Sequence, residues 1–457
     1  MRDTIRPMTT DLLPDLDGRL VLPSDDGYDD ARRPWNTAID QRPAAIVEAA
    51  SVADVQAVVR HARANGLRVA PQSTGHGAEA LAGDLGDAIL LRTERLDGVV
   101  IDGEARTARV GAGAKAGAVA RAAAEHGLAA TLGLAPSVGV AGLSLGGGIG
   151  WLSRVHGLAS NNIVSLDVVT ADGAARTVDA DRDPDLFFAL RGGGGRFALV
   201  TGLELALHPV DEVSAGMIAW PVEATADVLE QVRRWTLDAP ECLSAVVRVL
   251  ALPPIDAIPA PIRGRRIVAV VAAYIGPHHD AERVIAPLRG GGALLDTFGP
   301  IGLADLITVA GDPEDPGPSR GDGLLLKDLT PDAVATVAEL VADEALGALT
   351  VLELRQLGGA LGRPAPAGHG AIDRVDAAWA FFAGGFTPDA AAQQATVAAI
   401  ATARERLAPH AAEQVLLNSC AAGADPARAF APQVWERLLG IRGGHDPDGL
   451  IRAAHDG

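Results

Sequence analysis

The sequence predicts an α+β protein with two or three domains, and three observations lead to this prediction. Residues 44–72 read as a strand, an amphipathic helix and a second strand. Residues 127–153 carry no charge and are rich in glycine, which suits a loop wrapped closely around a ligand. From about Val222 longer helices alternate with strands, which is typical of a separate α+β unit.

Composition limits the function classes. The chain has 457 residues, 48% of them hydrophobic, and this is enough for substantial cores. A net charge of −19 without a basic cluster predicts that neither nucleic acid nor an anionic membrane surface is a partner. Cys242 and Cys420 are far apart, so we expect no disulfide framework, no metal site and a reducing, cytoplasmic location. The first 20 residues lack the apolar run of a signal peptide.

The first helix and the loop after the next strand are the most informative local elements. The helix is expected to begin near Ser51 and to end at Gly66, with Val55, Val58 and Val59 on its apolar face. The strand that follows leads into "APQSTGHGA", where His76 stands between two glycines. Glycine lets the backbone turn tightly and aim its N–H groups at a bound anion, but it does not explain the histidine.

The remaining elements follow in order along the chain. Short strands are expected within residues 88–111, then a helix over 117–125, a hairpin turning at Asp172-Gly173 and a strand over 197–210. In the second half we expect a helix over 225–237 and strands over 265–276, 348–357 and 378–385. A surface loop is expected over 310–323, a further strand over 414–420 and a final helix over 432–441.

The uncharged stretch 127–153 is long enough to cross a bilayer. However, its glycines and Pro136 would badly weaken a helix. We therefore interpret it as a ligand cradle rather than a membrane span.

A dinucleotide-binding fold of the Rossmann type is the alternative interpretation of the first half. A strand, the spacing Gly111-x-Gly113-x-x-x-Gly117 and a helix occur in the expected order. The glycine spacing departs from the fingerprint by one residue, and no acidic residue follows about 20 residues later to bind a ribose hydroxyl. The sequence therefore disfavours a nicotinamide enzyme.

Several ordered motifs resemble the berberine-bridge-enzyme-like flavoproteins of the vanillyl-alcohol-oxidase superfamily. The motifs are "YDDARRPWN", "PQSTGHGA", "LAPSVGVAGLSLGGGIGWLSRVHGLASNNI", "DLFFALRGGGGRFALVTGLELALHPV" and a late "LLNS". This resemblance implies a two-part FAD-binding domain of the PCMH type with an inserted α+β substrate domain built on an antiparallel sheet. The resemblance implies an N-terminal segment (1–37), the FAD domain (38–210) and the substrate domain (211–410). A C-terminal segment (411–457) would return to the FAD domain.

The resemblance also implies the cofactor and its site. His76 would be bonded covalently to the 8α-carbon of FAD, which a neutral imidazole can attack near neutral pH. The pyrophosphate would lie on backbone N–H groups, as suits an acidic protein. The implied cofactor-binding residues are Gln72, Ser73, Thr74, Gly75, His76, Gly77, Ala78, Ser137, Val138, Gly139, Gly142, Gly147, Gly148, Gly150, Asn162, Val200 and Asn418.

The chain departs from the family pattern at three places. Ala135 stands where many relatives have a cysteine that forms a second flavin bond, so we expect a single link. Arg196 replaces the small polar residue that is common after the four glycines. The C-terminal Asn-x-Asn pattern appears as Ala454-His455-Asp456, which puts a flavin contact from those amides in doubt.

The resemblance implies an oxidase or dehydrogenase that removes hydride from an alcohol, amine or related carbon of a small organic substrate. Family members often use a tyrosine or glutamate as base, but the tyrosines here are Tyr28 and Tyr274, so the candidates are Glu353, Arg355 and Gln356 in the strand "LELRQL". Strand alternation puts Glu353 and Arg355 on one face and Gln356 on the other.

Molecular oxygen is the expected electron acceptor. The chain offers no haem, iron–sulfur or nicotinamide site. In the family, a valine three places after the cysteine position is associated with oxygen access, and this residue is Val138. A dehydrogenase with another acceptor and a flavoprotein that has lost its chemistry stay open as alternatives, and the sequence predicts neither the substrate nor the oligomeric state.

Overall fold

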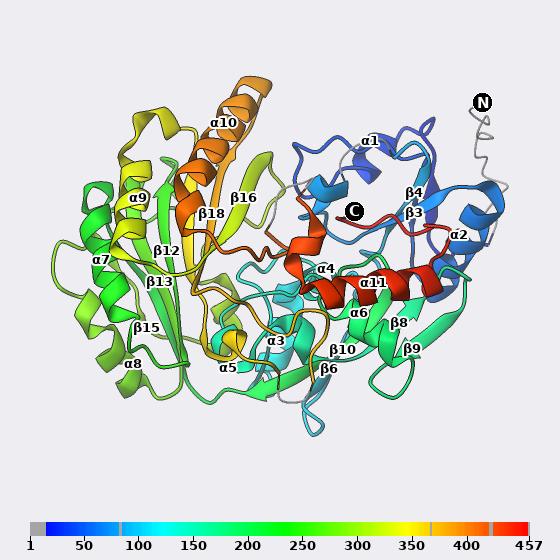
Figure 1. Cartoon of the computed structure of the whole chain (residues 1–457), viewed down its shortest axis with the longest axis horizontal. Coiled ribbons are helices and arrows are strands. Elements are labelled where there is room, and N and C mark those ends of the chain that lie inside the picture. The colour runs from blue at the N-terminus through cyan, green and yellow to red at the C-terminus, as the bar shows by residue number, and fades with distance from the viewer. Residues whose placement is uncertain (1–14, 82–84, 366–367, 420–423, 456–457) are drawn as a thin grey trace.

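The computed structural model describes residues 15–81, 85–365, 368–419 and 424–455. Cys420 and Asp456, which were singled out above, lie outside these residues. Three sheets organise the chain: an eight-stranded sheet with its helices lies on the left of Figure 1, and a four-stranded and a six-stranded sheet lie on the right. The predicted α+β class, with an antiparallel sheet in the second half, is confirmed.

The four-stranded sheet carries the strand that leads to His76. Its strand order is β1-β2-β4-β3, with β2, β4 and β3 parallel. Helix α2 connects β2 to β3, and Ser51 and Asp54 form a capping box at its start while Gly66 ends it at φ +65°. The bounds are β1 (Arg19–Val21), α1 (Tyr28–Ala31), β2 (Ala45–Glu48), α2 (Val52–Asn65), β3 (Arg68–Gln72) and β4 (Ala88–Arg92).

The six-stranded sheet is antiparallel throughout, in the order β5-β6-β10-β8-β9 with β7 beside β10. Strand β6, which ends at Gly111, pairs antiparallel with both neighbours, so the Rossmann interpretation is wrong: that fold needs a parallel crossover here. The bounds are β5 (Val99–Asp102), β6 (Thr107–Gly111), α3 (Ala116–Ala124), β7 (Leu128–Ala130), α4 (Val140–Leu145), α5 (Ser153–His156), β8 (Ile163–Val169), β9 (Ala175–Val178), α6 (Pro184–Leu190) and β10 (Leu199–Pro209).

The eight-stranded sheet has the order β14-β11-β13-β12-β17-β18-β16, with β15 beside β11. Helices α7 to α10 lie on its outer side in Figure 1. The bounds are β11 (Val213–Pro221), α7 (Thr225–Trp235), β12 (Leu243–Ala251), β13 (Arg266–Ile275), α8 (His278–Ile285), β14 (Leu295–Asp296), β15 (Gly299–Pro300), β16 (Ser319–Leu326), α9 (Pro331–Ala342), β17 (Val351–Gln356), β18 (Trp379–Phe386) and α10 (Ala390–Leu407).

The two faces of this sheet bury different partners. Val247 and Leu354 pack under the helices, together with residues of α7, α9 and α10. On the opposite face, Val246 and Val271 pack against Trp151, which lies near the end of the glycine-rich stretch. One face of the sheet therefore lies against the part of the chain that carries the predicted cradle.

The chain after residue 410 returns to the first half. The strand expected over 414–420 is wrong for its described part: residues 414–419 form coil and a turn. Val415, Leu416 and Leu417 are buried by packing in two small clusters, so this apolar run reflects side-chain packing and not strand pairing. Helix α11 (Pro432–His445) follows, and Ile451 then bridges Val69 of β3. The domain boundaries given above stay a prediction.

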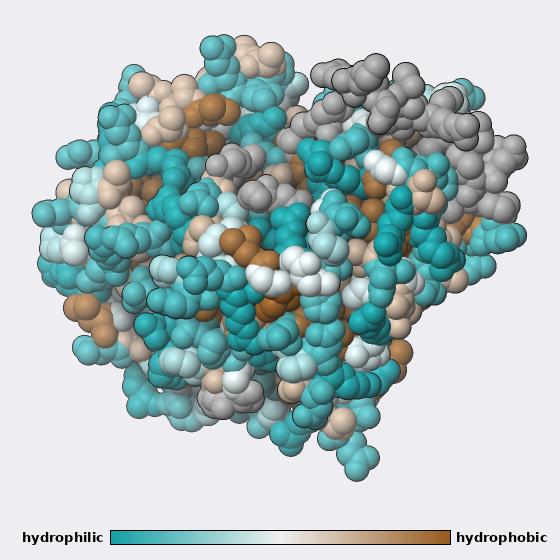
Figure 2. All heavy atoms as spheres, turned by 45° about the vertical axis from the view of Figure 1, so that its right-hand side comes forward, coloured by the Kyte–Doolittle hydropathy of each residue, from teal (hydrophilic) through white to brown (hydrophobic). Residues whose placement is uncertain are grey.

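The outer surface agrees with the acidic composition. Figure 2 shows a largely hydrophilic face on which apolar side chains occur in small patches. Within the described ranges, no helix is both long and apolar enough to cross a membrane.

Asp446 offers a test of how the tail is held. Its buried carboxylate accepts hydrogen bonds from the backbone N–H groups of Leu450 (2.8 Å) and Ile451 (2.9 Å). Asp446→Ala should lower the free energy of unfolding by about 2 kcal/mol, because two buried donors lose a charged acceptor. Chemical denaturation measures this change, and Asp448→Ala, at an exposed position, is the matched control. Equal stability of the two variants would contradict the assignment.

Candidate cofactor site

The His76 loop begins where β3 ends, and its glycines have distinct roles. Gly75 adopts φ +81°, and a Cβ there would lie 2.6 Å from Pro34 Cβ, so this position requires glycine. A Cβ at Gly77, in contrast, would meet no atom within 4 Å. The first glycine therefore fixes the turn, whereas the second is exposed and would tolerate a side chain without a clash.

Three side chains hold the His76 ring. Thr74 Oγ1 lies 2.8 Å from Nδ1, and Ser137 Oγ lies 3.4 Å from Nε2. Trp35 stacks on the imidazole, with ring centroids 4.2 Å apart and planes 18° from parallel. The Trp35 contact was missed from sequence, because 41 positions separate the two residues and no local pattern links them.

The surroundings keep this imidazole neutral. Burial, assisted by the positive charge of Lys115, lowers the pKa of His76 from 6.5 to about 4. At neutral pH the ring therefore has a free lone pair on one nitrogen, which a nucleophile needs.

The glycine-rich stretch packs directly against the His76 loop. A Cβ at Gly139 would lie 2.9 Å from Ser73 Oγ, and one at Gly150 would clash with the carbonyl oxygen of Leu132. The expectation that this stretch is a loop is wrong at two places. Its first residues form strand β7, and between Gly139 and Gly146 it forms the six-residue helix α4, whose Val140 and Ala141 are buried. A Cβ would be crowded at Gly139 and Gly146, at the two ends of this helix, but not at Gly142 within it.

Asn418 joins the C-terminal part of the chain to the same stretch. Its Oδ1 accepts a hydrogen bond from the Gly148 N–H (2.9 Å), and Gly148 adopts φ +76°. A Cβ at Gly146 would lie 2.5 Å from Asn418 Nδ2. Asn418 therefore contacts the glycine-rich stretch from a position 270 residues away along the chain.

Three of the predicted cofactor residues have surroundings unlike those of the His76 loop. Gly142 is exposed on α4. Asn162 donates to the carbonyl oxygens of His156 (2.9 Å) and Leu158 (2.8 Å), and its Oδ1 lies 2.8 Å from His208 Nε2, so its amide is already satisfied. Val200 lies on β10 in the core that also contains α4.

The residues present fit an FAD group. Within the described part of the chain, the buried amide of Gln72 and the hydroxyl of Ser73 have no hydrogen-bond partner. Buried polar atoms are normally satisfied, so these atoms are suited to a polar ligand. The crowded positions Gly75 and Gly139 let two backbone segments approach closely around the space beside His76. Gln72 to Ala78 and Ser137 to Gly150 would hold the group, without any basic cluster.

Two departures from the family pattern have structural partners. Arg196 is buried and lies over the Trp435 ring, 5.1 Å from its centroid. His455 Nε2 lies 2.9 Å from the carbonyl oxygen of Leu417, next to Asn418. Arg196 therefore packs the first half of the chain against α11, whereas this contact of His455 lies within the tail.

The three candidate bases lie on β17. Glu353 and Arg355 contact each other on the face toward the cradle: Oε1 accepts from Nη2 (2.7 Å), while Arg355 Nη1 donates to the carbonyl oxygen of Ile149 (3.1 Å). Glu353 Oε2 is 2.6 Å from Nη2 of Arg248, which also binds Asp312 (2.8 Å). Gln356 is buried, and its Oε1 has no partner within the described residues.

This network decides the protonation of Glu353. Burial alone would raise its pKa, but Arg355 and Arg248 outweigh burial and lower the pKa to about 2. A carboxylate with so low a pKa is a poor proton acceptor near neutral pH. Its observed contacts fit a structural ion pair that orients two arginines. The pairing with Arg248 was missed from sequence, because Arg248 lies 105 positions away.

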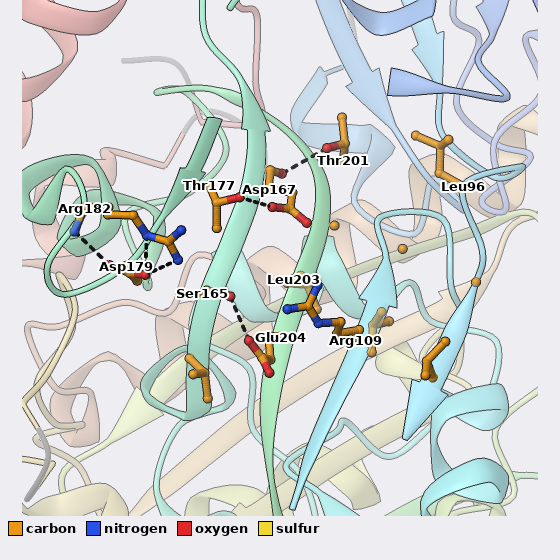
Figure 3. A pocket seen from close by; sticks show the side chains of 16 residues that line it. Leu96, Arg109, Ser165, Asp167, Thr177, Asp179, Arg182, Thr201, Leu203 and Glu204 are labelled. Carbon is orange, nitrogen blue, oxygen red and sulfur yellow. Dashed lines mark hydrogen bonds and ion pairs between the residues drawn. The ribbon is translucent and has the colours of Figure 1, made fainter. Parts of the chain in front are cut away.

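A separate hollow of about 500 Å³ lies on the six-stranded sheet (Figure 3). Its floor includes Arg109, Asp167 and Glu204, which alternate along β6, β8 and β10 with core residues of the opposite face, where α4 packs. Asp167 accepts from Thr177 (2.6 Å) and Glu204 from Ser165 (3.1 Å). This hollow lies on the side of the sheet away from α4 and is no candidate for the cofactor.

Glu353→Gln tests the ion-pair assignment. We expect a loss of about 3 kcal/mol in the free energy of unfolding at pH 7, because two guanidinium groups lose their shared buried partner. Since the folded pKa lies below the unfolded value of 4.5, this stability is present above about pH 4.5 and is lost as the pH falls toward 2. Denaturation at several pH values measures it, with the exposed Glu339→Gln as control. A pH-independent difference between Glu353→Gln and the parent would refute the assignment.

Comparisons with known proteins agree with this site. Residues 43–179, which include the His76 loop and the glycine-rich stretch, match the family described as FAD binding domain. (R)-6-hydroxynicotine oxidase from Paenarthrobacter nicotinovorans is 31% identical over 278 residues, which are 60% of this chain and 58% of that protein. The aligned region thus spans somewhat more than half the length of this relative.

Solved structures extend the similarity over the whole chain. The crystal structure of 6-hydroxy-D-nicotine oxidase from Arthrobacter nicotinovorans has a TM-score of 0.85 and 26% identity, and covers 98% of this chain and 99% of that one. Wild-type BBE-like 1 from Physcomitrella patens shares the fold, with a TM-score of 0.84, 21% identity and coverage of 97% and 98%. Residues 43–179 thus resemble a known FAD-binding domain, and the chain shares the overall fold of these two proteins.

Proposed function

We propose that this protein is an FAD-dependent oxidase that takes hydride from an alcohol, amine or related carbon of a small organic substrate. The FAD would be bonded covalently to His76, with no second link. The observation that carries this proposal is the neutral His76 imidazole, stacked on Trp35, in the same loop as the unsatisfied buried groups of Gln72 and Ser73. The similarity to a protein named (R)-6-hydroxynicotine oxidase supports oxidation of the substrate as the class of reaction.

The chain's own groups would bind the cofactor and exclude water. Backbone N–H groups of residues 72–78 and the amide of Gln72 would hold the polar part of FAD. Arg355 fixes the carbonyl of Ile149, and Asn418 fixes the N–H of Gly148, so the glycine-rich backbone is held in place on both sides of the turn. When bound, the flavin supplies a two-electron acceptor.

The eight-stranded sheet would provide the substrate side. Its inner face lies against the glycine-rich stretch through the contact of Val246 and Val271 with Trp151. Ile149, Leu357 and Ile372 are buried in one cluster, so apolar side chains from both halves exclude water beside the glycine backbone. The net charge of −19 favours a cationic amine among the possible substrates, because the field of the protein attracts cations.

Two alternatives differ from this proposal, one in the electron acceptor and the other in whether any substrate reduces the flavin. A dehydrogenase would pass electrons to an acceptor other than oxygen, and a flavoprotein without activity would keep its flavin oxidised with every substrate. Val138, half-buried beside Ser137, favours the oxidase, because a smaller side chain leaves a path for oxygen through packed protein. The low cysteine content supports a cytoplasmic location.

Covalent attachment is tested by acid precipitation. The precipitated protein should stay yellow, and peptide mapping should find flavin on the peptide with His76 alone. His76→Ala should release all flavin into the supernatant, because the proposed covalent bond needs the imidazole nitrogen. Flavin in the supernatant of the unchanged protein would contradict the covalent link, and an adduct on Cys242 or Cys420 would contradict the single link.

Oxygen use is tested by stopped-flow mixing of the anaerobically reduced protein with oxygenated buffer. Reoxidation should be much faster than that of free reduced flavin, and Val138→Ile should slow it about tenfold, equivalent to about 1.4 kcal/mol in the barrier. Val138→Ala is the control and should retain fast reoxidation. Slow reoxidation of the unchanged protein would identify a dehydrogenase.

A further inference from the structure

We propose that Trp35 is a positioning residue that holds the His76 imidazole in the orientation from which it bonds to the flavin. This inference rests on the proposed function and goes beyond it, because it assigns a residue that controls the linkage. Its starting point is the parallel stack of the two rings, with centroids 4.2 Å apart and planes 18° from parallel. Such a stack fixes the plane of the imidazole and shields one of its faces from water.

Trp35 is attached directly to the loop that it would position. Its backbone N–H donates to the carbonyl oxygen of Thr74 (2.9 Å). Its neighbour Pro34 fills the space where a Cβ at Gly75 would lie. The stack is therefore part of one rigid packing unit with the turn and does not depend on a mobile surface side chain.

The eight-stranded half of the molecule holds the other side of Trp35. The indole Nε1 donates to the carbonyl oxygen of Glu314 (3.2 Å), and the carbonyl oxygen of Trp35 accepts from the Gly317 N–H (3.1 Å). Asn36 makes two more bonds, from Nδ2 to the Ser319 carbonyl oxygen (3.0 Å) and from the Ser319 N–H to Oδ1 (3.1 Å). Trp35 thus lies between the His76 loop and residues 314–319.

Thr74 and Trp35 restrict different motions of the ring. The Thr74 hydroxyl at Nδ1 limits rotation within the ring plane, and the indole limits tilting of that plane. The second nitrogen, Nε2, then points toward Ser137 on the glycine-rich stretch. Holding reacting atoms in a near-attack geometry accelerates a reaction without changing its chemistry.

The atoms and electrons of the linkage reaction balance with molecular oxygen as the one added reagent. A C–N bond forms between an imidazole nitrogen and the 8α-carbon, while that carbon loses a C–H bond and the imidazole loses its N–H proton. The two electrons remain on the ring system as reduced flavin, and molecular oxygen takes them and becomes hydrogen peroxide. Trp35 takes no part in these bond changes.

The test compares full-length variants produced under flavin limitation and then mixed with FAD. Trp35→Leu should lower the rate of covalent incorporation, followed by intact mass, about tenfold or more at saturating FAD. Trp35→Phe keeps a flat ring and should stay within about threefold of the parent. The dissociation constant of FAD before linkage and the melting temperature should change little, because both loops keep their backbone contacts.

Trp235 provides the matched control. It is also half-buried and donates from Nε1 to a backbone carbonyl, that of Val284 (2.7 Å), but it lies on α7 away from His76. Trp235→Leu should therefore incorporate flavin at the parent rate. Two results would overturn the inference: an unchanged rate in Trp35→Leu, or a slower rate that merely follows equal losses in FAD affinity and melting temperature. If the parent itself forms no covalent bond, the proposed function fails first.

Discussion

The close contact between Gly139 and the Ser73–Thr74 turn is the constraint on which the rest of the site depends. A side chain at position 139 would occupy the place of Ser73 Oγ and separate the two segments. With the contact in place, Ser137 reaches the second nitrogen of His76, and the unsatisfied groups of Gln72 and Ser73 are enclosed near the same space. Glycine is thus used here for close approach of backbones, and in the proposed site backbone N–H groups would bind the phosphates of FAD.

Ion pairs and hydrogen bonds join this contact to the other half of the molecule. Arg355 donates to the Ile149 carbonyl and is itself oriented by Glu353, which Arg248 also binds. A buried carboxylate between two guanidinium groups costs desolvation energy but defines one geometry, and removal of any member leaves an unpaired charge. The same residues that suggested a catalytic base from sequence therefore act, on the observed contacts, to fix the glycine-rich backbone.

The sequence predicted what local pattern determines. Helix α2 was predicted because its apolar period, its cap at Ser51 and its stop at Gly66 agree, and the hairpin at Asp172-Gly173 because that dipeptide favours the turn. The strand over 414–420 was wrong for its described part, since an apolar run can be buried by side-chain packing without strand pairing. The Trp35 stack and the Arg248 pair were missed, because contacts between distant positions leave no pattern in one sequence. The resemblance supplied the cofactor, and the structure located the residues around His76.

A crystal structure of the purified yellow protein would locate the flavin. We expect flavin density between residues 72–78 and 137–150, continuous with the His76 imidazole, and a Trp35 ring that remains stacked on it. Flavin density on the turn at Gly111–Gly117, or in the hollow of the six-stranded sheet, would contradict the proposed site. So would a flavin in the predicted place with His76 turned away from it.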